Sequence, residues 1–190
     1  MASTMYSRIN IFGAPGSGVS TLGKGLAAHL GYAFFDTDDY YWYTSDALPY
    51  RRKRNTEHRH RLLTQDLAGA PQYVVAGALL GWGAPLLEHM DAVVYRWLPE
   101  NIRLQRIRER EIARYGAERL VPGGDLGAVY EKFQIWAAGY DNAAPERQRG
   151  GPAELLWLKN CSCPVLYLDQ DYPLSDLIGI ALEFFRWHYA

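Results

Sequence analysis

Nine residues near the N-terminus have the types and spacing of a loop that binds phosphate. Residues 13–21 read G-A-P-G-S-G-V-S-T and fit the pattern G-x-x-x-x-G-K-[ST] everywhere except at Val19, where the pattern has lysine. Glycines let the backbone curve until successive N–H groups point at one anion, and a following helix adds the positive end of its dipole. The residues expected to bind the phosphates of a nucleotide are Gly13, Ala14, Pro15, Gly16, Ser17, Gly18, Val19, Ser20 and Thr21.

The valine at position 19 removes a positive charge that such a loop normally presents to the β- and γ-phosphates. Lys24 shares the helical face of Ser20, but it starts about 5 Å further along the helix. We therefore expect Lys24 to be solvated, so that the missing charge comes from arginines elsewhere or the transfer of a phosphoryl group is slow. Ser20, at the Ser/Thr position of the pattern, offers its hydroxyl group to Mg²⁺.

A second group of chemically useful residues follows the apolar run 33–35, where the sequence reads D-T-D-D at 36–39. A carboxylate beside a hydroxyl group can orient it and accept its proton while charge shifts to a phosphoryl group. Asp36 and Asp38 are the candidates for this chemistry. Asp39 has a competing interpretation, since aspartate at the end of a strand commonly caps the turn that follows.

Aromatic and basic residues come next along the chain. Residues 40–43 read Y-Y-W-Y, and they either stack on a base or sugar ring or close a small lobe. Residues 51–54 read R-R-K-R, the strongest local cluster of basic charge. We expect Arg51 and Arg54 to bind an anionic acceptor through bidentate contacts. The alternatives are a solvated patch and a weak contact with nucleic acid, which would lose affinity steeply with salt.

The order of apolar runs and breakers predicts the elements that position these residues. Strands are expected at 6–12, 33–35, 73–76, 92–97 and 164–168. Helices are expected from the phosphate loop to Gly31 and at 56–68, 99–115, 126–142 and 174–187, with an irregular lobe at 40–54 and a polar connection at 142–152. Strands that alternate with helices predict a mostly parallel sheet covered on both faces, with ligands at the carboxyl ends of its strands.

Length and composition limit the alternatives. The 190 residues suit one domain with one sizeable core, and the net charge of −1 gives no global attraction to nucleic acid or membranes. No apolar run approaches the roughly 20 residues that span a bilayer, and the N-terminus does not read as a secretory signal. Cys161 and Cys163 are expected to be reduced cysteines rather than a metal site. We expect a cytoplasmic protein with no membrane partner.

The phosphate loop, the carboxylates after the second strand and an arginine-rich helix after Pro99 together resemble the P-loop nucleotide-kinase-like family, which includes adenylate, shikimate and gluconate kinases. Residues 16–23, G-S-G-V-S-T-L-G, and 36–42, D-T-D-D-Y-Y-W, are similar to a bacterial subgroup often labelled adenylate kinase or AAA family ATPase. The resemblance implies a three-layer α/β fold with a five-stranded parallel sheet in the order 2-3-1-4-5. It also implies a single domain over residues 1–190, with an acceptor-binding lobe at about 37–70 and a helical lid at about 99–150.

The resemblance implies roles for arginines of the lid. In adenylate-kinase-like proteins the lid helix opens with a proline and carries arginines seven and eleven residues later, and Arg106 and Arg110 stand at those distances from Pro99. We expect these two arginines to be catalytic. Arg103 and Arg114 share their helix face. The alternative is a solvated face that is salt-bridged to neighbouring glutamates.

The resemblance also assigns the carboxylates. Asp36 and Asp38 resemble the D-x-D of shikimate kinase, in which one carboxylate helps to hold Mg²⁺ and the other grips a substrate hydroxyl group. Asp36 is therefore expected to bind metal and substrate, with Ser20 as the other metal ligand, and Asp38 to bind substrate and act in catalysis. The third strand offers no carboxylate, since the run 73–77 ends in glycine, and this leaves Asp36 as the best second anchor for the metal.

These features predict an ATP- and Mg²⁺-dependent phosphotransferase that acts on a small molecule, either a nucleotide or a hydroxylated or phosphorylated metabolite. Its expected partners are a nucleoside triphosphate and a small-molecule acceptor. Two other interpretations stay open. Val19 motivates a non-catalytic nucleotide-binding or regulatory protein, and the basic cluster at 51–54 motivates an NTPase associated with nucleic acid, although we do not expect nucleic acid as a partner.

Overall fold

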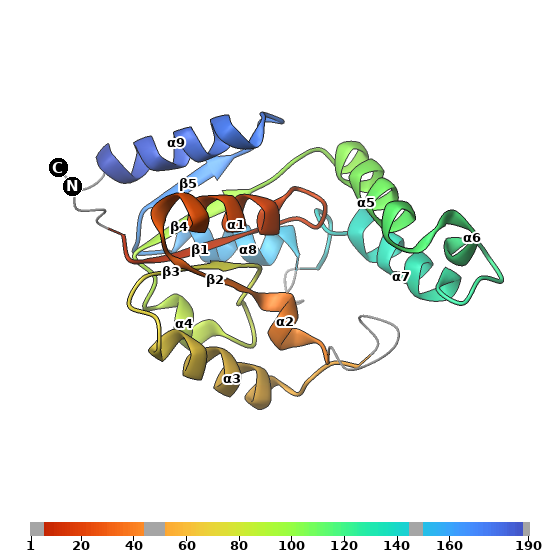
Figure 1. Ribbon diagram of the computed structural model, residues 1–190, viewed down its shortest axis with the longest axis horizontal. Helices are drawn as coiled ribbons and strands as arrows, with labels where there is room; N and C mark the ends of the chain where they lie inside the picture. The colour runs from red at the N-terminus through yellow and green to blue at the C-terminus, as the bar shows by residue number, and fades with distance from the viewer. Residues whose placement is uncertain (1–5, 44–51, 145–149, 188–190) are drawn as a thin grey trace.

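The computed structural model describes residues 6–43, 52–144 and 150–187 of the chain, and Figure 1 shows their arrangement. At the centre lies a five-stranded, all-parallel sheet in the order β2-β3-β1-β4-β5. Its strands are β1 (Arg8–Gly13), β2 (Ala33–Asp36), β3 (Tyr73–Ala76), β4 (Ala92–Arg96) and β5 (Val165–Leu168). The sheet and its strand order confirm the α/β fold predicted from the sequence.

Helices cover both faces of this sheet. The described helices are α1 (Val19–Leu30), α2 (Thr37–Tyr41), α3 (Thr56–Ala68), α4 (Ala84–Leu87), α5 (Glu100–Tyr115), α6 (Ala117–Leu120), α7 (Gly127–Ala138), α8 (Gly151–Lys159) and α9 (Leu174–Trp187). Helices α1 and α9 pack on one face, and α3, α4 and α8 pack on the other (Figure 1). None of the described helices is long and apolar enough to cross a membrane.

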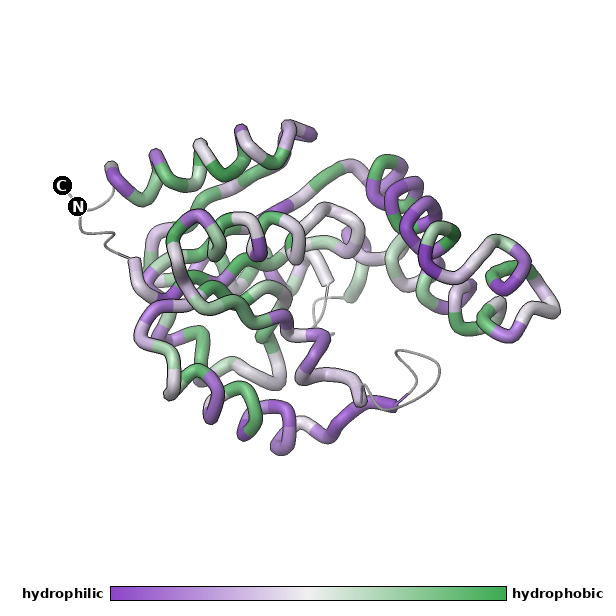
Figure 2. Tube along the Cα trace, in the orientation of Figure 1, coloured by the Kyte–Doolittle hydropathy of each residue, from purple (hydrophilic) through white to green (hydrophobic). Residues whose placement is uncertain are grey.

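The interior strand β4 shows how the sequence produces this layering. Ala92 and Val94 join the apolar core under α1 and α9, whereas Val93 and Tyr95 join the core that packs against α8. Side chains alternate across a strand, so the apolar run 92–95 is buried on both faces of the sheet. Figure 2 shows the resulting hydrophobic centre of the molecule, with hydrophilic residues concentrated on the outer helices.

The sheet brings the two candidate chemical motifs to one edge. Gly13 at the end of β1 is level with Arg96 of β4, and Asp36 at the end of β2 is level with Ala76 of β3. Because all strands run in the same direction, the phosphate loop and the carboxylates both leave the carboxyl edge of the sheet. Helices α5, α6 and α7 project from this edge as a helical arm (residues 100–138; Figure 1).

Several described helices differ from the sequence prediction. Helix α8 lies where no element was predicted, because its pattern is not that of an amphipathic helix: Leu155 and Leu156 are exposed while Glu154 is fully buried. Helix α2 has five residues and begins inside the D-T-D-D segment, and so short a helix shows no periodicity in the sequence. The short helices α4 and α6 escaped prediction for the same reason. The helix predicted at 126–142 ends at Ala138.

Candidate phosphate-binding site

The phosphate loop runs from the end of β1 into the first turn of α1. Gly16 and Gly18 have φ angles of 82° and 93°, in the left-handed region that glycine adopts without steric cost. Ser17 closes the loop on itself, since its Oγ donates to the carbonyl oxygen of Ala14 at 2.7 Å and its backbone N–H donates to the same oxygen at 3.2 Å. Gly18 is the N-cap of α1 and no side chain caps this helix. The N–H groups of its first turn are therefore left for an anion.

The first turn of α5 lies directly against this loop. A Cβ atom added to Gly16 would lie 2.5 Å from the carbonyl oxygen of Arg103, so position 16 has no room for a side chain. A Cβ atom added to Gly18 would meet nothing closer than Nη1 of Arg106 at 4.0 Å. An uncapped helix start with open space beside it and a guanidinium group at its border fits the phosphates of a nucleotide.

The residues that follow Gly18 match the expected pattern in chemistry but not in charge. Ser20 and Thr21 are exposed on the first turn of α1, so the Ser20 hydroxyl group is accessible to a ligand. Val19 is partly buried and packs against the apolar core under α1 and α9. Lys24 is exposed on the next turn. The loop therefore carries no cation of its own at position 19.

The arginines of α5 fall into two environments. Arg103 is fully buried, whereas the side chains of Arg106 and Arg110 are 41% and 47% exposed. Arg106 forms an ion pair with Asp171, which lies between β5 and α9, and Arg110 contacts its neighbour Glu111 at 2.9 Å. The structure thus places Arg106 beside the phosphate loop, while the described ion pair of Arg110 is within α5. The catalytic roles of both residues stay predictions.

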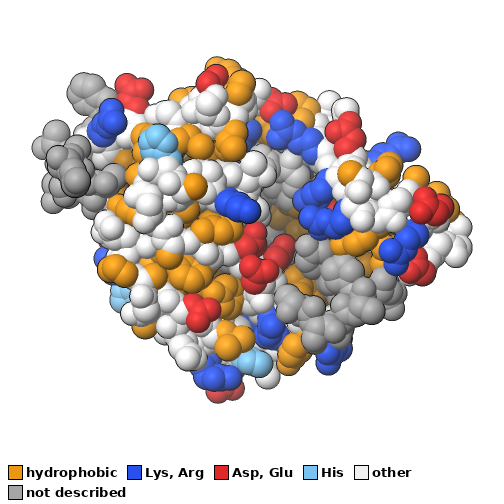
Figure 3. Space-filling view, in the orientation of Figure 1, with side chains coloured by type: hydrophobic (Ala, Val, Ile, Leu, Met, Phe, Trp, Pro, Cys, Tyr) orange, Lys and Arg blue, Asp and Glu red, His pale blue; other side chains and the backbone are white. Residues whose placement is uncertain are grey.

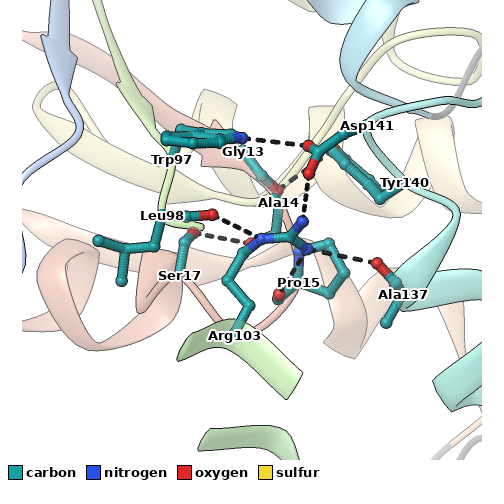
Figure 4. Close-up of polar contacts among 10 residues, drawn as sticks. All are labelled: Gly13, Ala14, Pro15, Ser17, Trp97, Leu98, Arg103, Ala137, Tyr140 and Asp141. Atoms are coloured by element: carbon teal, nitrogen blue, oxygen red, sulfur yellow. Dashed lines mark hydrogen bonds and ion pairs between the residues drawn. The ribbon is translucent and has the colours of Figure 1, made fainter. Parts of the chain in front are cut away.

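A polar network lies next to the phosphate loop (Figure 4). Asp141 forms an ion pair with Arg103 and accepts a hydrogen bond from Trp97 Nε1 at 3.1 Å. The hydroxyl group of Tyr140 bonds to Glu154 and lies 3.3 Å from the carbonyl oxygen of Gly13. Sequence reasoning missed this network, because its members come from separate segments and no local spacing connects them.

The carboxylates after β2 are arranged around the start of α2. Asp36 is half-buried, and its Oδ1 accepts the backbone N–H of Asp38 at 3.0 Å, so Asp36 and not Asp39 caps this helix. Asp38 and Asp39 are exposed. Although Asp39 is exposed, desolvation of its carboxyl group by neighbouring atoms, and then the negative charge of Asp36, raises its pKa. Figure 3 shows acidic side chains gathered between the starts of α1 and α2, with basic side chains over α5 nearby.

The end of β3 shows why no carboxylate stands there. Gly77 has a φ angle of 111°, and a Cβ atom added to it would lie 1.8 Å from Oγ1 of Thr37. The first residue of α2 therefore fills the space that a side chain at position 77 would need. Asn10 Nδ2 also donates to the carbonyl oxygen of Gly77 at 3.1 Å. Ser20 and Asp36 stay the predicted metal ligands.

The described part of the basic cluster folds back on the aromatic run. Arg54 Nη1 donates to the carbonyl oxygens of Asp39 at 2.6 Å and Tyr40 at 3.1 Å, and also to that of Trp42. The Arg59 guanidinium group lies 3.7 Å from the ring centroid of Tyr41. Arg54 therefore closes the lobe after α2, and its predicted contact with an acceptor stays untested. Arg51 lies outside the described residues.

The position of Arg54 predicts an effect on stability. Arg54→Ala is expected to lower the free energy of unfolding by about 2 kcal/mol, because it leaves carbonyl groups at the end of α2 without their charged donor. Urea unfolding measures this difference. Arg61→Ala, at an exposed position of α3, is the matched control and should change stability by less than about 0.5 kcal/mol. Equal stability of the two variants would contradict the structural role of Arg54.

The sheet order and the phosphate loop define a P-loop protein with the nucleotide-kinase-like fold. No family model matches the chain. Shikimate kinase from Bacteroides thetaiotaomicron has a similar structure, with a TM-score of 0.55, 15% identity and coverage of 96% of this chain and 99% of that chain. A gluconokinase from Sinorhizobium meliloti 1021 has a TM-score of 0.51 at 18% identity, covering 95% of this chain and 91% of that chain. At these identities the likeness concerns the fold.

A sequence relative gives the family. The uncharacterized protein YqaC of Bacillus subtilis (strain 168) is 38% identical over 180 residues, which cover 95% of this chain and 98% of YqaC. The chain belongs to the same family as YqaC. Identity at this level along nearly the whole of both chains means that the fold described here extends to that relative.

Proposed function

We propose that the chain is an ATP- and Mg²⁺-dependent phosphotransferase that acts on a small molecule. The observation that carries the proposal is the start of α1, which has no side-chain cap, follows glycines in the left-handed region and is bordered by the Arg106 guanidinium group 4.0 Å from a Cβ built on Gly18. Solved structures with this fold include shikimate kinase and a gluconokinase, which favours a small acceptor over a macromolecule.

Each candidate residue has a defined part in this proposal. Bound ATP would supply the γ-phosphoryl group, and Mg²⁺ would neutralise part of the phosphate charge. The N–H groups of the phosphate loop would hold the phosphates, and Ser20 and Asp36 would hold the metal. Asp38 would orient the hydroxyl group of the acceptor and take the proton of that group. At the same time the acceptor oxygen bonds to the γ-phosphorus atom and the bond between that phosphorus and ADP breaks. Arg106 stabilises the charge that develops on the transferred group.

Binding and turnover are tested separately. ATP with Mg²⁺ should raise the melting temperature, because a ligand that binds only the folded state stabilises it. Each further tenfold excess of ligand over Kd adds about 1.4 kcal/mol to the free energy of unfolding. Labelled ATP is then incubated with a panel of nucleosides, nucleotides and hydroxylated or phosphorylated metabolites. A labelled product supports the proposal. No thermal shift at millimolar ATP would reject nucleotide binding and the proposed function with it.

The metal site gives a prediction of its own. Ser20→Ala is expected to remove most of the gain in ATP affinity that Mg²⁺ provides, because it deletes the hydroxyl ligand at the start of α1. Thr21→Ala changes the next exposed residue of the same turn and should leave that gain in place. The comparison is made by calorimetric titration of ATP with Mg²⁺ and with EDTA. An equal dependence on Mg²⁺ in both variants would exclude Ser20 as a ligand.

A regulatory, non-catalytic protein is the second candidate, and Val19 favours it. This side chain packs into the apolar core and adds no charge to the site, so nucleotide could bind without efficient transfer. ATP binding with no labelled product across the panel would favour this candidate. The nucleic-acid candidate has less support, because three arginines of the basic region already have partners within the protein. The guanidinium carbons of Arg52, Arg54 and Arg59 lie 4.7, 4.9 and 3.7 Å from the centroids of aromatic rings.

A further inference from the structure

Arg103 is a buried cation whose guanidinium group is bonded in several directions (Figure 4). Its Nε donates to the carbonyl oxygen of Leu98 at 2.8 Å, and its Nη1 lies 3.3 Å from that of Ala137 and 3.5 Å from that of Pro15. Its Nη2 forms the ion pair with Asp141. Burial of a charge is costly unless it is paired and hydrogen-bonded, and this arrangement meets both conditions.

The groups that Arg103 joins belong to three different parts of the fold. Leu98 lies just before the helical arm, Ala137 lies at its end and Asp141 follows it. Pro15 belongs to the phosphate loop. Arg103 therefore ties both ends of the arm together and to the loop at one point. Trp97 strengthens the junction by donating to the same carboxylate at 3.1 Å.

The phosphate loop is contacted through its backbone by α5 and by Tyr140. The carbonyl oxygen of Arg103 itself closes the space at Gly16, where a Cβ would lie 2.5 Å away. The carbonyl oxygen of Gly13 lies 3.3 Å from the Tyr140 hydroxyl group. The contacts to Pro15 and Gly13 are long for hydrogen bonds. The loop is therefore restrained mainly by the packing of α5 against it. The stronger bonds of Arg103 to Leu98 and Asp141 hold α5 in that position.

We infer that Arg103 is a positioning residue that holds the phosphate loop in its anion-binding conformation and fixes the helix turn that carries Arg106. The side chain of Val19 has no hydrogen-bond donor, and the described contacts that hold the loop come instead from Arg103 and Tyr140, with Asp141 paired to Arg103. Arg106 lies one turn along the same helix, and any shift of Arg103 moves it relative to Gly18. The consequence for ATP rests on the proposed function, whereas the order of the loop does not.

Hydrogen exchange of the protein without nucleotide tests the inference directly. In Arg103→Met, backbone amides of residues 13–21 should exchange about tenfold faster or more, because the hydrogen bonds and the ion pair that hold α5 against the loop are lost. Amides of β3 should stay slow, since a local effect leaves the sheet core closed. Arg119→Met breaks an ion pair at the far end of the arm, with Asp125 at 2.7 Å, and should leave residues 13–21 unchanged. Native-like exchange of the loop in a folded Arg103→Met would overturn the inference.

A graded series guards against simple unfolding. Asp141→Asn keeps the guanidinium group but removes its counter-charge, and Arg103→Lys keeps the charge but not the fork that reaches several carbonyl groups. Both should loosen the loop less than Arg103→Met does. If Arg103→Met does not fold, these two variants decide: faster loop exchange at unchanged β3 exchange supports the inference, and exchange that rises equally in loop and sheet overturns it.

Nucleotide titration adds a readout of function. If native protein binds ATP, Arg103→Met should raise Kd about tenfold or more at a temperature where it stays folded. Arg8→Met breaks a pair with Asp91 at 2.6 Å near the start of β1, and serves as a control that lowers stability without a change in Kd. Equal ATP affinity of native protein and Arg103→Met would overturn the inference. Failure of native protein to bind ATP would instead reject the proposed function and leave the exchange result standing.

Discussion

Arg106→Ala is expected to lower kcat by about 10³-fold or more, the effect of a well-placed arginine on phosphoryl transfer. The loop has no cation at Val19, so the charge that develops on the transferred group depends on a guanidinium group beside Gly18. The loss should appear in kcat and not in the fold. Both partners of the Arg106 ion pair with Asp171 are about 40% exposed, and such a pair contributes little to stability.

Two matched variants separate this role from general loss of basic charge. Arg108→Ala removes an exposed arginine of the same helix, and Lys24→Ala removes the exposed lysine of α1. Neither substitution should lower kcat by more than about threefold, which corresponds to a change of less than about 1 kcal/mol in the activation free energy. Steady-state rates at saturating ATP and acceptor provide the comparison. A larger loss in Lys24→Ala than in Arg106→Ala would show that the lysine reaches back to the phosphates.

The sequence was informative where chemistry and local structure coincide. The glycines at 13, 16 and 18 allow the curve of the loop and also its proposed contact with phosphate, so one pattern predicts both. Asp36 ends β2 close to where the sequence predicted the strand to end, but its place as the cap of α2 was not predicted, since the sequence suggested Asp39 for a cap. The strand order followed from the family resemblance and was confirmed.

The sequence was uninformative where partners are far apart in the chain. Arg103 shares a helical spacing with Arg106, which placed both on one predicted face, yet Arg103 is buried because Asp141, 38 residues away, completes its ion pair. Helix α8 was missed because its buried face includes Glu154, whose partner Tyr140 lies on another segment. A charged residue reads as exposed in a one-dimensional pattern, and only its distant partner makes burial favourable.

The second large effect is expected at the acceptor side of the site. Asp38→Asn keeps the shape and hydrogen bonding of the side chain but cannot accept a proton, so kcat should fall by about 10²–10⁴-fold, the usual contribution of a positioned base. The Kd of ATP should stay within about twofold, because the phosphates are held by the loop. The backbone N–H that caps α2 on Asp36 is unchanged in this variant, and the short helix should stay in place.

Asp39→Asn is the control, because Asp39 is the next residue, is also exposed and belongs to the same short helix. Desolvation and the charge of Asp36 raise the pKa of the Asp39 carboxyl group. At a given acidic pH a larger share of Asp39 is therefore neutral than of an unshifted aspartate, and the loss of its charge changes less. Single-turnover rates with labelled ATP measure both variants at the same pH. If Asp39→Asn lowered the rate and Asp38→Asn did not, Asp39 would be the residue that takes the proton. The small molecule that receives the phosphoryl group would then bind one residue further along α2. If neither changed the rate, the acceptor would bind away from α2, and the carboxylates would serve the metal and the helix cap alone.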